Sequence, residues 1–204
     1  MTRAGAHGST RRHPRGRAGE RGVALIEAAF VTPIFMVLIF GMVEFGLVMN
    51  NYLGVANAAR AGARVASASG NSTQADFAVL QAVAKESTAI KRSDIVYIVV
   101  FKASATGDAP TAACQSGTAT SGVCNVYVSA DLARPSTDFG CGNSSPDRYW
   151  CPSTRKVAQS VASGGPPDYI GVWVKVTHHW VTKMFGSTKS LTDSSVIRLE
   201  PLKL

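Results

Sequence analysis

The longest pattern in the chain is an apolar run near its N-terminus. Residues Val23–Met49 contain only two charged side chains, Glu27 and Glu44. As a helix rising about 1.5 Å per residue, this run extends about 40 Å, which exceeds the roughly 30 Å of a hydrocarbon core. A helix that is apolar on every face over this length is rare in soluble proteins. The run therefore predicts a single transmembrane helix.

Small residues continue the pattern beyond this run. They recur every four positions, so the set turns around the helix by about 40° per step and does not keep to one face. Small side chains let other elements approach a helix closely, so the set predicts tight packing. The element that packs against these small residues could be this chain's own sheet or another subunit. The positions are Gly46, Asn50, Gly54, Ala58, Gly62, Ala66 and Gly70.

Helical periodicity returns at residues 76–90. Apolar side chains recur there at intervals of three and four, which predicts an amphipathic helix. Its stripe comprises Phe77, Leu80, Ala84 and Thr88, with Val83 beside it.

Four later segments have the composition of β-strands, at residues 95–101, 125–130, 169–180 and 195–200. They are rich in β-branched and aromatic residues, and the third alternates cleanly between two faces. A long helix, a second helix and then strands predict an α+β fold with a mainly antiparallel sheet of about four strands. In the third segment, one face holds Ile170, Val172, Val174 and Val176, and the other holds Gly171, Trp173, Lys175 and Thr177.

The charge of the chain is concentrated in its first 22 residues. These hold six arginines and one acid, or 6 − 1 = +5 of the net charge of +8. Positive charge on one side of a span places that side in the cytoplasm, so the rest of the chain is expected outside. A basic arm that binds nucleic acid needs no apolar run behind it. The lipid bilayer is thus the expected partner, and nucleic acid is not.

A cleavable secretory signal is an alternative to a permanent span. Such a signal has an apolar region of about 7–15 residues followed by a cleavage site between small residues. The run here is much longer, and the candidate site Ala56–Ala58 lies well past its end. The pattern therefore favours a retained helix.

The junction between basic arm and apolar run holds a glutamate four positions after Val23. A carboxylate deep in an apolar helix costs up to about 2.5–3.5 kcal/mol at the bilayer centre, so such a residue usually has a partner or a task. If the chain were cut after Gly22, Val23 would carry a positive α-amine. Glu27 lies on the same helix face. It could pair with that amine or with the amine of an adjacent copy.

This junction is similar to that of type IV prepilins, which have a short basic leader, a glycine before the cut and glutamate at the fifth mature position. Val23 departs mildly from the commoner Phe or Met, and 22 residues is long for such a leader. Three further blocks make the chain resemble the TadE-like proteins more closely. They are Glu27–Pro33, Gly41–Gly46 and Asn57–Arg64, and they contain the motif residues Pro33, Glu44, Arg60 and Arg64.

The resemblance implies a non-enzymatic, pilin-like component of the tight-adherence, or Flp pilus, system of the bacterial cell surface. It implies cutting after Gly22 by a membrane prepilin peptidase, and association with other pilin-like subunits and the pilus assembly platform. The expected organisation is a basic cytoplasmic leader at 1–22, a transmembrane helix with its extension at 23–70, and an extracytoplasmic domain at 71–204.

The motif residues carry separate expectations. Pro33 frees the carbonyl of Ala29 from its helical hydrogen bond. The proline could kink the membrane helix, or the helix could tolerate it without a kink. Glu44 lies about 32 Å along the axis from Val23, at the outer interface, where a plain interfacial carboxylate is favoured over a second buried pairing site. Arg60 and Arg64 share one helix face and could contact lipid phosphates, acids of a partner or water.

Two long loops, at 105–122 and 134–168, are rich in small and polar residues, with one or two helical turns expected at 157–162. The four cysteines lie in or beside them, and both inner spacings are ten positions. We expect the disulfides that close each loop, because an extracytoplasmic compartment favours oxidation. Zinc is the alternative, but close Cys-x-x-Cys pairs are missing. The expected pairs are Cys114–Cys124 and Cys141–Cys151.

No catalytic pattern emerges. His178 and His179 are consecutive on a strand, so they are expected on opposite faces and are poor joint metal ligands. Neither a Gly-x-Ser-x-Gly elbow nor a phosphate-binding loop occurs in the sequence. The sequence thus predicts no enzyme, cofactor or metal site. The alternative function is a single-span, membrane-anchored binding or sensor domain.

Overall fold

The computed structural model describes residues 18–157 and 165–200. The chain divides into two compact units, Met1–Val43 and Glu44–Leu204. The first helix, α1 (Ala18–Ser69), contributes to both. The second unit, which contains the packed core, therefore begins within α1, at Glu44.

The first unit leaves its apolar side chains uncovered. Val23 is 66% exposed, Leu25 72% and Phe30 75%. In the described part of the chain, α1 is the one helix long and apolar enough to cross a membrane, and its most apolar stretch has no buried residue. A core helix of a soluble protein would bury that stretch, so its exposed apolar surface fits lipid contact.

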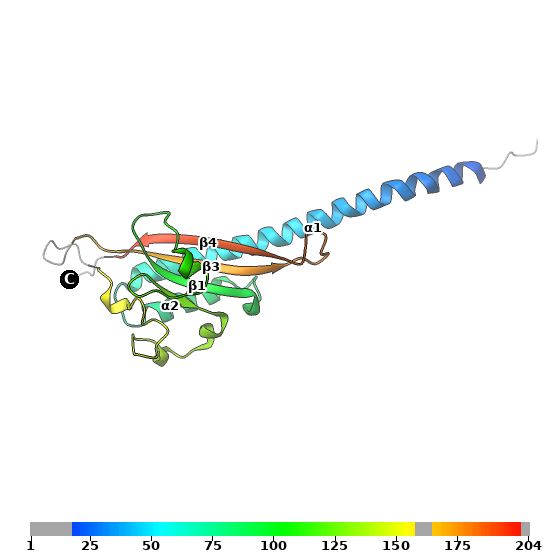
Figure 1. The fold of residues 1–204 in the computed structure, drawn as a ribbon. Helices are drawn as coiled ribbons and strands as arrows, with labels where there is room; N and C mark the ends of the chain where they lie inside the picture. Colours follow the sequence, from blue (N-terminus) through cyan, green and yellow to red (C-terminus); the bar gives the residue numbers. More distant parts are fainter. Residues whose placement is uncertain (1–17, 158–164, 201–204) are drawn as a thin grey trace, which may run out of the picture. The chain divides into compact units, whose positions relative to one another are not determined.

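The second unit contains a four-stranded antiparallel sheet in the order β2-β1-β3-β4 (Figure 1). Its fold class is therefore the predicted α+β fold. The strands are β1 (Ile95–Ala103), β2 (Cys124–Tyr127), β3 (Tyr169–His179) and β4 (Thr188–Arg198). Short 3₁₀ segments are Arg92–Asp94, Ser129–Ala133, Ser136–Asp138 and Pro152–Thr154, and α3 is Ala112–Gln115.

The strand boundaries differ most from the prediction at the start of β4 and the end of β2. β4 begins at Thr188, seven residues before the predicted segment, and pairs with β3 along its whole length. Its first half is polar because an edge strand with a solvated face needs no apolar alternation. β2 ends at Tyr127, since the chain turns into the 3₁₀ segment that starts at Ser129.

The second helix is shorter than predicted. α2 runs from Ala75 to Glu86, and the backbone N–H of Ser87 donates to the carbonyl of Val83 at its end. Thr88 therefore lies beyond the helix and is exposed, so its predicted place on the stripe is wrong. The remainder of the proposed helical turn at 157–162 lies outside the described residues.

The core lies between the sheet and two helices. Figure 1 shows the cyan part of α1 and α2 along one side of the sheet. Alternate residues of β3 are buried on this side, as predicted, and pack with α1 and α2 in one cluster. Its members include Ile170, Val172, Val174 and Val176 from β3, Val55, Ala59 and Ala63 from α1, and Val79 and Val83 from α2.

The opposite face of the sheet is also covered. Phe101 and Trp173 pack there with the buried cysteines of the first disulfide loop. Phe101 pairs in register with Gly171 on the neighbouring strand. A Cβ atom at Gly171 would lie 2.2 Å from the Phe101 ring, so the aromatic ring occupies the space of a missing side chain.

Gly62 marks the closest approach of α1 to the sheet. A Cβ atom at this position would lie 3.0 Å from methyl groups of both Val172 and Val83. Gly54 and Gly70 likewise face side chains of the same domain, whereas a Cβ atom at Gly46 would meet nothing within 4 Å. From Gly54 onward, the set of small residues thus packs on the chain's own domain.

We predict that Gly62→Val lowers the free energy of unfolding by about 1–3 kcal/mol, the usual cost of overpacking a core. Gly46→Val is the matched control, because it makes the same change in the same helix where space is open. Urea unfolding in detergent, followed by circular dichroism, measures both. Equal stabilities of the two variants would contradict the proposed close packing at Gly62.

Candidate functional site

The junction that the sequence singles out lies on α1. Gly22, Val23 and Glu27 are all helical and exposed, because α1 begins at Ala18. A Cβ atom at Gly22 would meet nothing within 4 Å. Among residues 22–157 and 165–200, no side chain forms a hydrogen bond or ion pair with Glu27. The junction is therefore an open surface whose carboxylate has no partner within the described chain.

Pro33 does not end the helix. α1 continues through it for another 36 residues, to Ser69. The proline removes one backbone donor within the apolar stretch.

Glu44 is not the solvated interfacial carboxylate that the sequence favours. Its side chain is fully buried and accepts a hydrogen bond from the backbone N–H of Thr182, in the turn between β3 and β4. Periodicity along α1 predicts how far Glu44 lies from Val23, but it carries no information on a hairpin that packs over it. The turn, 138 positions away in sequence, is what buries the carboxylate.

A second contact joins the same elements two turns further along α1. The side-chain amide of Asn51 lies 2.8 Å from Nδ1 of His178 at the end of β3. Glu44 and Asn51 are seven positions apart and lie on the same side of the helix. Together they fasten the end of the β3–β4 hairpin to α1.

Arg60 and Arg64 stay exposed one turn apart. Neither forms an ion pair with another residue of the described chain. Their guanidinium groups are therefore available to water or to a partner outside this chain.

Residues 22–64 match a family model described as TadE-like protein. The match spans the junction, Pro33, Glu44 and both arginines. Residues 22–64 are a TadE-like domain. Neither a curated protein nor a solved structure gives a significant match. The TadE-like family implies a pilin-like, non-catalytic protein associated with the Tad pilus. Together with the disulfides, the apolar helix indicates membrane anchoring with an extracytoplasmic domain.

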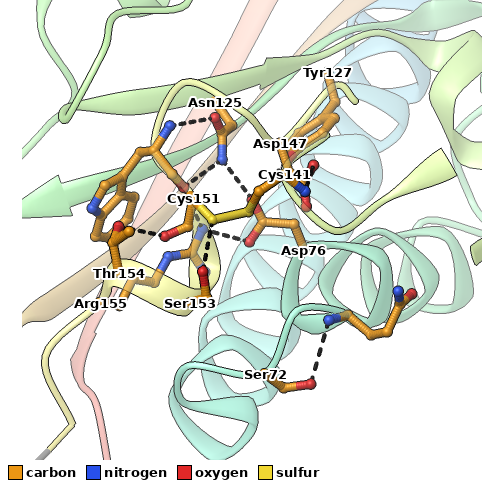
Figure 2. Close-up of polar contacts among 12 residues, drawn as sticks. Ser72, Asp76, Asn125, Tyr127, Cys141, Asp147, Cys151, Ser153, Thr154 and Arg155 are labelled. Carbon is orange, nitrogen blue, oxygen red and sulfur yellow. Dashed lines mark hydrogen bonds and ion pairs between the residues drawn. A yellow bond between two sulfur atoms is a disulfide. The ribbon is translucent and has the colours of Figure 1, made fainter. Parts of the chain in front are cut away.

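Beyond the TadE-like domain, the most concentrated chemistry is a buried polar cluster at the start of α2 (Figure 2). The carboxylate of Asp76 pairs with the guanidinium of Arg155 at 2.7 Å, and both side chains are fully buried. Its other oxygen accepts hydrogen bonds from Asn125 at 2.8 Å and from the Tyr127 hydroxyl at 2.6 Å. Burial and the neighbouring Asp76 raise the pKa of Tyr127 well above its usual value. The phenol therefore stays protonated and donates.

This cluster attaches the second long loop to the sheet. The Asn125 side chain donates to the carbonyl of Trp150 and accepts from its N–H, both at 2.8 Å. The Arg155 guanidinium lies over the Trp150 ring, 4.3 Å from its centre. The contacts all point inward, so the cluster stabilises the domain and offers no open reactive group.

Sequence patterns alone do not reveal this cluster. Asp76 lies at the start of a predicted helix, where an acid is ordinary. Its partners come from β2 and from a loop 79 positions away, and no local spacing links them. An acid in the first turn that falls on the buried face of α2 was the one available signal.

The two disulfides have the predicted pairing, Cys114–Cys124 and Cys141–Cys151. No cysteine is free for zinc. The first disulfide is buried in the core of the sheet's second face. The second closes the loop beside Trp150, where the buried carboxylate of Asp147 accepts the N–H groups of Gly140 and Cys141 at 2.9 and 3.0 Å.

The two consecutive histidines do lie on opposite faces, since His178 is buried and His179 exposed. Across the residues that the structure describes, no three His, Cys, Asp or Glu side chains gather as a metal site would require.

We predict that Asp76→Ala lowers the free energy of unfolding by about 3–5 kcal/mol, because it leaves a buried arginine unpaired. Asp138→Ala is the control. It removes a partner of Arg134 in an exposed pair 3.3 Å long, which contributes at most about 1 kcal/mol. Denaturant unfolding of the oxidised protein compares the two. The structural role of the cluster would be refuted by similar losses in both variants.

Proposed function

We propose that this protein is a pilin-like subunit that takes part in assembly of a tight-adherence pilus. The N-terminus faces the cytoplasm, α1 crosses the cytoplasmic membrane, and residues 71–204 lie outside. The observation that carries the proposal is the match to the TadE-like family, which begins at Gly22 and includes an apolar stretch of helix that the described residues leave uncovered. No catalytic, cofactor or nucleic-acid role is proposed.

Processing after Gly22 by a prepilin peptidase is part of the proposal. The basic leader resembles those of prepilins, and the family match starts at the residue expected before the cut. The open surface around Gly22 is compatible with access by a membrane peptidase. Once the leader is removed, the new amine of Val23 lies one helical turn from Glu27.

Glu27 then has a role in assembly. In a lipid environment an unpaired carboxylate is costly, and the described chain offers it no partner. The α-amine of Val23 in a neighbouring subunit has the charge to satisfy it, and each subunit would supply one amine and one carboxylate. Such a pair fixes the axial register of α1 against the helices of other pilin-like subunits and the assembly platform.

The alternative is a single-span, membrane-anchored binding or sensor domain with no pilus role. It predicts an intact N-terminus and no requirement for Glu27. The mature N-terminus and the piliation of Glu27 variants therefore distinguish the two functions.

We predict that Gly22→Leu leaves the precursor uncut, because a peptidase groove that accepts glycine has little room for a side chain. Gly41→Leu, in the same helix and equally free of close neighbours, should be processed normally. Intact mass of the membrane-extracted protein measures the outcome. Wild-type mature mass in Gly22→Leu would exclude cleavage at this position.

We predict that Glu27→Ala and Glu27→Gln insert into the membrane as well as the wild type but fail to support piliation. Insertion improves because a costly carboxylate is gone, while the amine of the neighbouring Val23 loses its partner at about 3–5 kcal/mol. Thr32→Ala controls for a polar change in the same span. Carbonate extraction measures insertion, and co-purification with pilus subunits and pilus counts measure assembly. Normal piliation of both Glu27 variants would favour the anchored-domain alternative.

A further inference from the structure

The turn between β3 and β4 exposes an unusual amount of apolar surface. We define the hairpin tip as residues 180–187. Val181 is 71% exposed, Phe185 58% and Met184 43%. Turns of soluble domains are usually polar, because they run through water. Three large apolar side chains in one short turn therefore indicate a surface that meets something other than water.

The hairpin tip has a defined shape. The ring of Trp180 lies 5.4 Å from that of Phe185 and 5.1 Å from that of His178, measured between centres. The N–H of Trp180 donates to the carbonyl of Ser187, and that of Gly186 donates to Lys183, both at 3.2 Å. The apolar groups are thus presented by a closed turn.

The contacts of the hairpin tip place it beside the end of the apolar run. The N–H of Thr182 donates to Glu44, and Glu44 lies five residues before Met49, the last residue of that run. The apolar surface continues on α1 in the same compact unit, where Phe45 is 65% exposed and Met49 44%. The tip therefore lies beside the last turns of the apolar run, and both expose large apolar side chains.

The charges around the hairpin tip are positive. Residues 180–190 contain Lys183 and Lys189 and no acid. Among the nearest acids, Glu44 is buried under the tip, and Asp94 faces His179 with 3.8 Å between their charged atoms. A tryptophan, neighbouring apolar groups and flexible lysines match the outer headgroup layer, where aromatic rings settle and lysines reach phosphates.

We propose that the hairpin tip inserts into the outer headgroup region of the membrane that α1 crosses, and so attaches the exported domain to lipid at a second point. The proposal rests on the span in the proposed function. Lipid is the occupant because Glu44 fixes the tip at the level where the apolar run ends and where headgroups surround the helix. The tip would restrain how the exported domain turns about α1.

The test uses the three tryptophans of the full-length protein in phosphatidylcholine–phosphatidylglycerol vesicles. Trp150 and Trp173 are buried in the domain, at 4% and 6% exposure. Phosphatidylcholine brominated on acyl carbons close to the headgroup should quench part of the emission. Trp180→Phe should abolish that quenching while keeping a ring beside Phe185. Phe185→Asp should reduce the quenching at least about twofold, because a charge placed in an apolar contact with lipid is costly.

Val128→Asp is the control, since it changes an apolar side chain that is 43% exposed outside the hairpin tip. It should leave the quenching unchanged. Equal quenching in the wild type and Trp180→Phe would overturn the proposal. A Trp180 whose emission changes only after other pilus subunits are added would also overturn it, because the tip would then contact protein and not lipid. Carbonate extraction separates the two failures: release of the protein refutes the span itself, whereas a retained protein with unquenched Trp180 refutes only the tip.

Discussion

The close approach of α1 to the sheet determines how the rest of the domain is arranged. At Gly62 the helix backbone lies so near Val172 and Val83 that a methyl group would be in tight contact with both. This allows one helix to be apolar and uncovered in its first half and packed by small residues in its second. The change occurs at Glu44, the first residue of the folded unit.

The two long loops are held by a few specific bonds and not by the apolar packing that joins α1 to the sheet. Two disulfides each close ten positions of chain, and the buried pair of Asp76 and Arg155 ties the second closed loop to α2 and β2. A buried ion pair contributes little net stability compared with a well-packed apolar alternative, but losing one member is costly. We therefore regard this cluster as a device that fixes one loop position, and the apolar core as the main source of stability.

Local patterns predicted the features that depend on local chemistry. Alternation along β3 predicted which residues share a face of the strand, and the apolar run predicted a transmembrane helix, whose most apolar stretch is uncovered in the structure. The equal spacing of the cysteines, the two loops that they close and the expected oxidising compartment together predicted the disulfide pairs. The polar first half of β4 carried no alternation, because its partner strand supplies the hydrogen bonds and its exposed face requires no apolar residue.

Features that depend on distant partners could not be predicted in this way. The burial of Glu44 requires Thr182, and the ring of Phe101 fills the space at Gly171 on another strand. Asp76 gave no hint of Arg155. Periodicity describes one element at a time, whereas these contacts arise only when two elements meet. In the TadE-like domain, the sequence and the family match together single out residues, but the partners that we propose for them lie outside the chain.

The strand order has a consequence for the time course of folding. β1 is central, yet its neighbour β3 lies more than 60 positions later in the chain, with Ile98 opposite Val174. Contacts between such distant segments form slowly, because a long loop must close before they gain anything. The helices and β1 cannot complete their packing until β3, in the last quarter of the chain, is available. The part of α1 that packs on β3 therefore stays incompletely covered until late in biogenesis, although it is among the most deeply buried surfaces of the finished domain.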